Sequence, residues 1–245
     1  MYGCILACAM KVFINGKFVD GKKAVISVFD HGFLYGDGVF ETLMSLGVKV
    51  WNVDAHVDRI FNSARLMRMP LSWKKKQVRG WIVSAVRKNG FDRSRIRLTI
   101  TRGVNGFDFM SVKKPTVCII VTRNKPWPKE YYRRGIDVIT ARVERTYPAV
   151  KTTSLIANII AQQKMNDAKC QEAILVDRHG HVTEGTTSNV LFVRNSTLIV
   201  PKDEALAGTT MAIVCKLARK IGMKVEERFV MEKEIMRMEE CFITS

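Results

Sequence analysis

The sequence predicts an α+β protein built from two parts. Strand patterns and helix patterns follow one another without strict βαβ alternation, which is typical of α+β folds. The segment NKPWPKEYY (residues 124–132) interrupts these patterns with Pro126 and Pro128, and is the predicted linker between the parts. The 245 residues are 47% hydrophobic and 26% charged, a composition that supports a packed core and excludes wholesale disorder.

The first part alternates short strands with two long helices. Asn15-Gly16 is a strong hairpin signal between two strands in KVFINGKFV. Apolar side chains recur at helical spacing in the segment that follows Asp54, its predicted N-cap, and in a second segment that Asn89-Gly90 closes. The predicted helices cover 54–69 and 72–90, and the further strands 24–30, 95–103 and 116–123.

The second part is predicted to hold many short strands and few helices. A helix after Ser154 has Leu155, Ile156, Ile159 and Ile160 as its apolar positions. Gly222 ends a second helix. The predicted strands cover 137–143, 172–177, 182–185, 189–193, 197–201, 224–230 and 241–245, and the other helices 208–222 and 231–238.

The chain is strongly basic, with a formal net charge of +17 and a pI near 9.8. Such a charge favours anionic partners such as phosphates, carboxylates or nucleic acid. The basic residues are scattered, however, and Lys74-Lys75-Lys76 is the longest run, without interleaved aromatic residues. We therefore interpret this run as a solvated face and expect no nucleic-acid partner.

Cysteines and histidines give no metal-site pattern. The six cysteines form no CxxC pair, and most lie in apolar runs, as reduced cysteines of a cytoplasmic protein would. His179 and His181 flank Gly180 in what we interpret as a polar hairpin turn. No stretch is long enough to span a membrane. We expect a cytoplasmic protein with no membrane partner and no metal.

Lys151 stands three residues before Ser154, the predicted N-cap of a helix. A helix N-terminus carries partial positive charge, so an ammonium is poorly placed there. A neutral amine, in contrast, can attack a carbonyl and form a Schiff base. The aldehyde of pyridoxal phosphate would be such a carbonyl, and it also needs a grip on its phosphate and a partner for its ring nitrogen.

Two other places could supply those functions. Gly208, Thr209 and Thr210 begin a predicted helix, whose free N–H groups and dipole suit an anion, although most helix starts bind none. Glu184 ends a predicted strand at Gly185 and could hold a protonated ring nitrogen, although such a residue is more often a solvated charge.

Several motifs occur together in one order along the chain. They are DHGFLYGDGVFE (30–41), HVDRI (56–60), Lys151, EAILVD with VTEGTTSNV (172–190) and LAGTT (206–210). This set resembles the class IV pyridoxal-phosphate enzymes, which include branched-chain aminotransferases, D-amino acid aminotransferases and aminodeoxychorismate lyases. The resemblance extends over nearly the whole chain.

The resemblance implies roles for residues at matching positions. Lys151 would be the Schiff-base lysine and proton shuttle, and Glu184 would face the pyridine nitrogen. Arg59 would hold the phosphate together with the helix start at 208–210. The loop at 33–38, with Phe33, Tyr35 and Gly36, would border the substrate pocket. Arg97 would be a pocket arginine, although taken alone it is a solvated strand residue.

Some positions depart from the patterns of the known subfamilies. Branched-chain enzymes commonly read Tyr-x-Arg where this chain has Arg95-Ile96-Arg97, and they commonly carry a cofactor-binding tyrosine near Leu155. D-amino acid enzymes carry an Arg-x-His clamp, and TRGVNGFDF has no such histidine. The resemblance therefore indicates the class more firmly than the substrate.

The resemblance implies a two-domain fold of type IV. A small N-terminal α/β domain would occupy residues 1–122, a linker 123–130 and a larger cofactor domain 131–245. The implied reaction is ping-pong transamination between a branched-chain L-amino acid and 2-oxoglutarate, in a homodimer with shared active sites. Aminodeoxychorismate lyase and D-amino acid aminotransferase activities are alternatives, as is a non-catalytic basic phosphate- or nucleic-acid-binding protein.

The last residues, CFITS, are predicted to begin a strand. Class IV enzymes usually continue beyond this point with a threonine-containing loop that meets the cofactor phosphate. We therefore expect the sequence to be truncated at its C-terminus.

Overall fold

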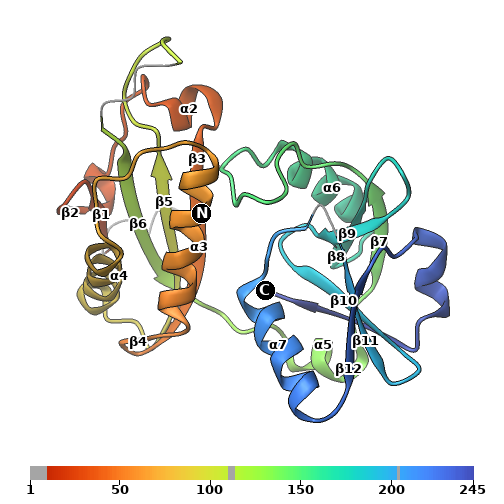
Figure 1. Cartoon of the computed structure of the whole chain (residues 1–245). Coiled ribbons are helices and arrows are strands. Elements are labelled where there is room, and N and C mark those ends of the chain that lie inside the picture. Colours follow the sequence, from red (N-terminus) through yellow and green to blue (C-terminus); the bar gives the residue numbers. More distant parts are fainter. Residues whose placement is uncertain (1–9, 110–113, 203–204) are drawn as a thin grey trace. The chain divides into compact units, whose positions relative to one another are not determined.

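The computed structural model describes residues 10–109, 114–202 and 205–245, so the predictions on Cys4 and Cys8 lie outside the described part. The chain forms two compact units (Figure 1). One unit contains the chain up to Pro126 together with Val150–Ser154, and the other contains Trp127–Ala149 and Leu155–Ser245. The short segment that carries Lys151 therefore belongs with the N-terminal half, although it lies beyond the predicted linker in sequence.

The first unit is built on a six-stranded antiparallel sheet in the order β2-β1-β6-β5-β3-β4. Asn15 and Gly16 form the β1–β2 turn with positive φ angles of 47° and 89°, which confirms the predicted hairpin. The strands are β1 (Lys11–Ile14), β2 (Lys17–Asp20), β3 (Gly38–Leu46), β4 (Lys49–Val50), β5 (Arg93–Thr101) and β6 (Thr116–Arg123).

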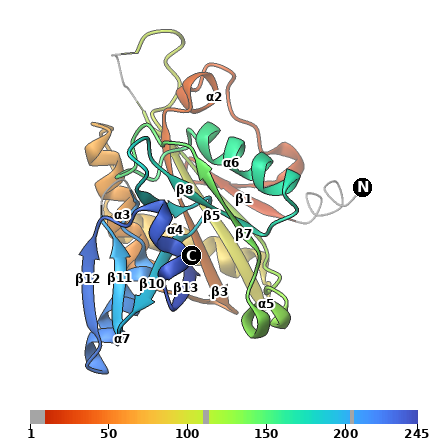
Figure 2. The same cartoon turned by 90° about the vertical axis from the view of Figure 1, so that its right-hand side faces the viewer.

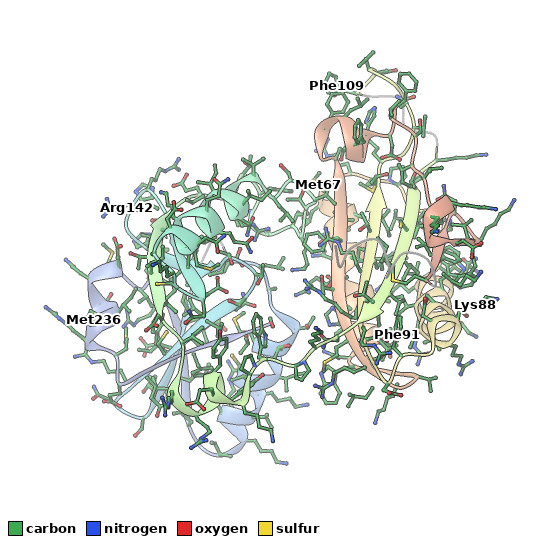
Figure 3. All side chains as sticks on the ribbon, turned by 180° about the vertical axis from the view of Figure 1, so that it is seen from behind. Met67, Lys88, Phe91, Phe109, Arg142 and Met236 are labelled. Atoms are coloured by element: carbon green, nitrogen blue, oxygen red, sulfur yellow. The ribbon has the colours of Figure 1, made fainter. Side chains whose placement is uncertain are left out.

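Helices α3 (Val53–Leu66) and α4 (Lys75–Asn89) supply the other side of the core of this unit. Gly90 ends α4 in the left-handed conformation, as predicted. Lys88, labelled in Figure 3, lies in the last turn of α4 with its ammonium 5.7 Å from the Phe18 ring centroid. The core contains apolar residues of both helices and of β1, β3, β5 and β6. The unit also contains η1 (Gly21–Lys23) and α2 (His31–Tyr35).

The second unit contains two smaller mixed sheets. The order is β12-β11-β10-β13 in one and β7-β8-β9 in the other, and the pairs β11–β12 and β7–β8 are parallel. Figure 2 shows β12, β11, β10 and β13 side by side in this order. The strands are β7 (Val138–Arg142), β8 (Glu172–Val176), β9 (Val182–Gly185), β10 (Asn189–Arg194), β11 (Thr197–Pro201), β12 (Lys224–Arg228) and β13 (Glu240–Thr244).

Helices of the second unit pack on these sheets. Apolar residues of α7 (Thr209–Lys220) join the cluster around β10, β11 and β12, whereas α6 (Ile156–Asp167) packs on β7 and β8. The short elements are α5 (Lys129–Arg134) and η2 (Glu232–Arg237). Arg142 of β7, labelled in Figure 3, pairs with Glu232 at the start of η2, with Nη2 and Oε2 3.2 Å apart.

Three predictions about local structure are wrong. Residues 24–30 form no strand, because they find no partner beyond an isolated bridge from Asp30 to Val104. Asp54 lies inside the first turn of α3, whose N-cap is Asn52. Ser154 does not cap α6, because Leu155 occupies the N-cap and the Ser154 N–H donates to the Thr152 hydroxyl at 3.2 Å.

The apolar face predicted for α6 is also wrong. The helix buries Asn158 and Ala161, while Ile156, Ile159 and Ile160 are exposed. Among the described residues, no helix combines the length and apolar composition that crossing a bilayer requires.

Candidate active site

Lys151 is held on the edge of β3 by its main chain. Its carbonyl accepts from the Phe40 N–H at 2.9 Å, and the Thr153 N–H donates to the Gly38 carbonyl, also at 2.9 Å. A Cβ on Gly38 would lie 2.9 Å from Thr153 Oγ1, so this approach needs a glycine. The segment stays on β3 until Ser154, which explains why α6 begins only at Ile156. The argument from a helix dipole therefore does not explain this lysine.

The Lys151 ammonium shares one aromatic ring with a second cation. Its Nζ lies 4.9 Å from the Phe40 ring centroid, and Arg97 Cζ lies 3.4 Å from the same centroid. The ring attracts both cations, but two like charges close together oppose each other. This environment disfavours the ammonium form of Lys151 relative to the amine, and an amine is the form that can attack a carbonyl.

The loop predicted to border the substrate pocket lies in the same unit. Phe33 and Tyr35 belong to α2, and Gly36 ends that helix in the left-handed conformation. The Thr153 hydroxyl donates to the Gly36 carbonyl at 2.7 Å, so the loop is tied to the segment that carries Lys151. Phe33 is 71% exposed, and Tyr35 packs on the Phe109 ring at 4.7 Å.

Arg59 projects from α3 to a buried carboxylate on β3. Its Nε and Nη2 donate to the two oxygens of Glu41 at 2.6 and 2.7 Å, and His56 Nδ1 lies 2.7 Å from Oε2. Burial would raise the pKa of Glu41, but the hydrogen bonds from Arg59 and His56 outweigh it and hold that pKa below its ordinary value. Glu41 therefore fixes the orientation of the Arg59 guanidinium, a role that no local sequence signal indicates.

Glu184 lies on β9 in the second unit and is only 5% exposed. The Arg145 guanidinium donates to its Oε1, and the Leu206 N–H donates to Oε2 at 3.1 Å. A carboxylate with an arginine partner is stabilised as an anion. Arg145 was not predicted from the sequence, because it lies 39 residues before its partner in a segment without a motif.

The start of α7 is joined to Glu184 through the loop between them. Gly208 is the N-cap of α7 and supplies no capping side chain, while Thr209 and Thr210 begin the helix. A Cβ on Gly208 would come within 1.9 Å of Asn189 Oδ1, and the Asn189 amide donates to the Leu206 carbonyl at 2.8 Å. Leu206 therefore connects both features. The Thr210 hydroxyl donates to the Ser245 carbonyl at 3.0 Å.

The predicted residues thus fall into two groups. One group, in the first unit, contains Lys151, Arg97, Arg59 and the loop at Phe33–Gly36, and the other, in the second unit, contains Glu184 and Gly208–Thr210. Their chemistry fits pyridoxal phosphate: an amine for the aldehyde, a buried anion for the ring nitrogen, and a helix N-terminus without its own capping side chain for the phosphate.

Comparisons with known proteins agree with this interpretation. A family model described as amino-transferase class IV matches residues 38–245. A Methanocaldococcus jannaschii protein with the provisional name branched-chain-amino-acid aminotransferase is 37% identical over 245 residues, covering 96% of this chain and 84% of its own length. A D-alanine aminotransferase of Bacillus licheniformis is 28% identical with the same coverage.

Solved structures give the same result. The T.th. branched-chain amino acid aminotransferase, in complex with N-(5'-phosphopyridoxyl)-L-glutamate, has a TM-score of 0.89 at 25% identity. The match covers 97% of this chain and 82% of that structure. A second structure of that enzyme, with pyridoxamine 5'-phosphate, also gives 0.89 at 26% identity. The two-domain fold of type IV is therefore confirmed, and the chain belongs to the class IV aminotransferases, a family of enzymes that use pyridoxal phosphate.

Proposed function

We propose that this chain transfers an amino group between a branched-chain L-amino acid and 2-oxoglutarate in two ping-pong half-reactions. The observation that carries the proposal is the placement of Lys151, anchored on β3 with its ammonium and the Arg97 guanidinium against one Phe40 ring. The relative with 37% identity and its name support the branched-chain assignment.

Each residue has a defined task in this proposal. The cofactor, when bound, supplies an electron sink for the carbon that loses its proton. The Lys151 amine binds the cofactor aldehyde and then carries that proton away from the substrate carbon and back. Glu184, kept anionic by Arg145, holds a proton on the ring nitrogen. Arg59 and the N–H groups at 208–210 bind the phosphate.

The test of Lys151 is chemical. Borohydride reduction of the purified holoprotein followed by peptide mapping should place the cofactor adduct on Lys151, and Lys151→Ala should give none at this position. An adduct on another lysine would contradict the assignment.

The test of the substrate is a donor profile. L-leucine, L-valine, D-alanine and aminodeoxychorismate are supplied in turn, with 2-oxoglutarate as acceptor. We expect glutamate to form in equal amount to the keto acid from the branched-chain donors. Reaction with D-alanine alone would assign the D-amino acid activity instead, and release of pyruvate without glutamate would assign the lyase.

We also propose a homodimer. Exposed apolar side chains gather around α2 in the first unit, where the Asn105 N–H donates to the Phe29 carbonyl and Tyr35 packs on Phe109. The exposed members are Val25, Val28, Phe29, Phe33, Val104, Phe107 and Phe109. A patch of this kind is typical of a protein interface. Light scattering coupled to size exclusion should give twice the mass of the chain.

A cytoplasmic location is the last part of the proposal. The four described cysteines are free thiols, which suits a reducing compartment. Small amino acid and keto acid substrates are also available there.

A further inference from the structure

Arg95 and Arg97 lie on one face of strand β5. Side chains of a strand alternate between its two faces, and here Ser94, Ile96 and Leu98 are buried while the arginines between them are not. Arg95 is exposed and Arg97 is half-buried. The strand therefore presents two guanidinium groups in succession on the face that carries Phe40.

Among the described residues, neither guanidinium has an acidic partner. Arg97 lies on the Phe40 ring, and its Nε makes a long hydrogen bond of 3.4 Å to the Thr99 hydroxyl. In the part of the chain that the structure describes, Arg95 and Arg97 form no ion pair with a carboxylate. Other half-buried arginines of this unit, Arg59 and Arg102, each bind a carboxylate directly.

The two cations also oppose each other. Burial lowers the pKa of Arg97 to about 10, and the nearby positive charge of Arg95 lowers it further in the same direction, whereas Glu41 acts against this. Arg97 still remains charged at neutral pH. An anion bound between the two side chains would relieve the repulsion and would be held by charge-assisted hydrogen bonds.

The arrangement along the sheet indicates which anion. Lys151 is bonded to Phe40, Phe40 is the register partner of Thr99, and Arg95 follows Arg97 at a greater distance along β5. Alternate residues of a strand are about 7 Å apart. A substrate whose reacting carbon is at Lys151 would therefore present its far end to the arginines.

We propose that Arg95 and Arg97 jointly bind the side-chain carboxylate of the dicarboxylic substrate, and that Arg95 is a specificity-determining residue for that half-reaction. This inference rests on the proposed function, and it concerns the position where branched-chain enzymes commonly have tyrosine. An aliphatic side chain has no charge to offer Arg95, so the monocarboxylic half-reaction gains much less from it. Two fixed cations instead favour a dicarboxylate such as glutamate or 2-oxoglutarate.

The first experiment measures binding without reaction. Glutarate has two carboxylates and neither an amino nor a keto group, and 4-methylpentanoate has one carboxylate and a branched aliphatic chain. Isothermal titration of the holoprotein should show that Arg95→Met weakens glutarate binding at least tenfold relative to 4-methylpentanoate. Arg93→Met, on the same face two residues further from Arg97, should leave the affinity for both compounds unchanged.

A glutarate affinity that Arg95→Met leaves unchanged would overturn the proposal, and so would an equal loss of both ligands. Arg95→Lys should restore part of the glutarate affinity, because it returns the charge without the planar donor pair. A loss of glutarate binding in Arg93→Met as large as in Arg95→Met would show general attraction to a basic surface, and it would also overturn the proposal.

The second experiment separates the inference from the proposed function. Single-turnover reactions with L-glutamate and with L-leucine are followed by the cofactor absorbance. Arg95→Met should lose apparent affinity for glutamate at least tenfold more than for leucine. If the unaltered protein reacts with glutamate but not with leucine, the branched-chain assignment fails while the role of Arg95 is still decided by the glutamate and glutarate results.

Discussion

Thr186 binds the carboxylate of Glu172 twice. Its N–H donates to Glu172 Oε1 at 3.0 Å and its hydroxyl donates to the same atom at 2.6 Å, while the Ser188 hydroxyl donates to Oε2 at 2.8 Å. Glu172 also accepts from the Ala173 N–H at 2.9 Å and is buried. This buried anion therefore fixes the turn that directly follows Glu184.

Replacing Glu172 by glutamine should destabilise the second unit. The amide would present N–H groups to donors that now meet carboxylate oxygens, and the mismatched buried groups cost about 2 kcal/mol or more. We expect a lower free energy of unfolding in urea denaturation. Glu227→Gln, at an exposed position of β12, should change the stability by less than about 0.5 kcal/mol. Equal stability of the two variants would contradict a structural role for Glu172.

Glu184→Gln should reduce turnover more than cofactor binding. An anion at the ring nitrogen stabilises charge that develops during the reaction, so its effect belongs to the transition state. We expect the variant to retain the cofactor and to lose at least about tenfold in kcat, which corresponds to about 1.4 kcal/mol. The measurement is steady-state kinetics on protein with a determined cofactor content. Near-normal kcat would remove Glu184 from this role.

Local sequence signals predicted the parts of the fold that local geometry decides. The Asn15-Gly16 hairpin and the glycine end of α4 were correct, because a positive φ is decided by the residues themselves. Residues 24–30 look like a strand but pair with none, because strand formation depends on a partner elsewhere in the chain.

The same distinction explains the candidate site. Lys151, Glu184 and Gly208 could be named from motifs, whereas Glu41, Arg145 and Glu172 support them through contacts that the sequence does not reveal. The Arg145–Glu184 pair spans 39 residues, and the Glu172–Ser188 bond spans 16. Whether a carboxylate is solvated or buried among donors depends on such distant contacts.

Gly208→Ala should weaken cofactor binding. The added Cβ would come within 1.9 Å of Asn189 Oδ1, so Asn189 must move, and the Leu206 main chain that it holds against Glu184 would move with it. We expect at least a tenfold higher dissociation constant for pyridoxal phosphate, measured by fluorescence titration of the apoprotein. Gly80→Ala in α4 has open space around it and should leave this constant unchanged. An unchanged constant in both variants would exclude the α7 start from the cofactor site.

Arg59→Ala should also weaken cofactor binding more than it lowers kcat at saturating cofactor. A guanidinium offers charge-assisted hydrogen bonds to a phosphate, and Glu41 orients it from the other side. Arg65→Ala, further along α3 with a side chain that donates to Asn62, is the matched control. Equal cofactor affinity in Arg59→Ala and Arg65→Ala would show that the phosphate is bound elsewhere.

The stability of the first unit should fall at acidic pH through Glu41. Its pKa is held below the ordinary value of 4.5, because the hydrogen bonds from Arg59 and His56 outweigh burial. A lowered carboxyl pKa contributes stability that is fully present above the unfolded-state value and is lost as the pH falls through the folded-state value. Urea unfolding between about pH 6 and pH 3 should therefore show a steep acid limb that Glu41→Gln flattens, at the cost of lower stability at pH 7. Glu227→Gln should leave the slope unchanged, and an equally steep limb in Glu41→Gln would assign the acid sensitivity to other carboxylates.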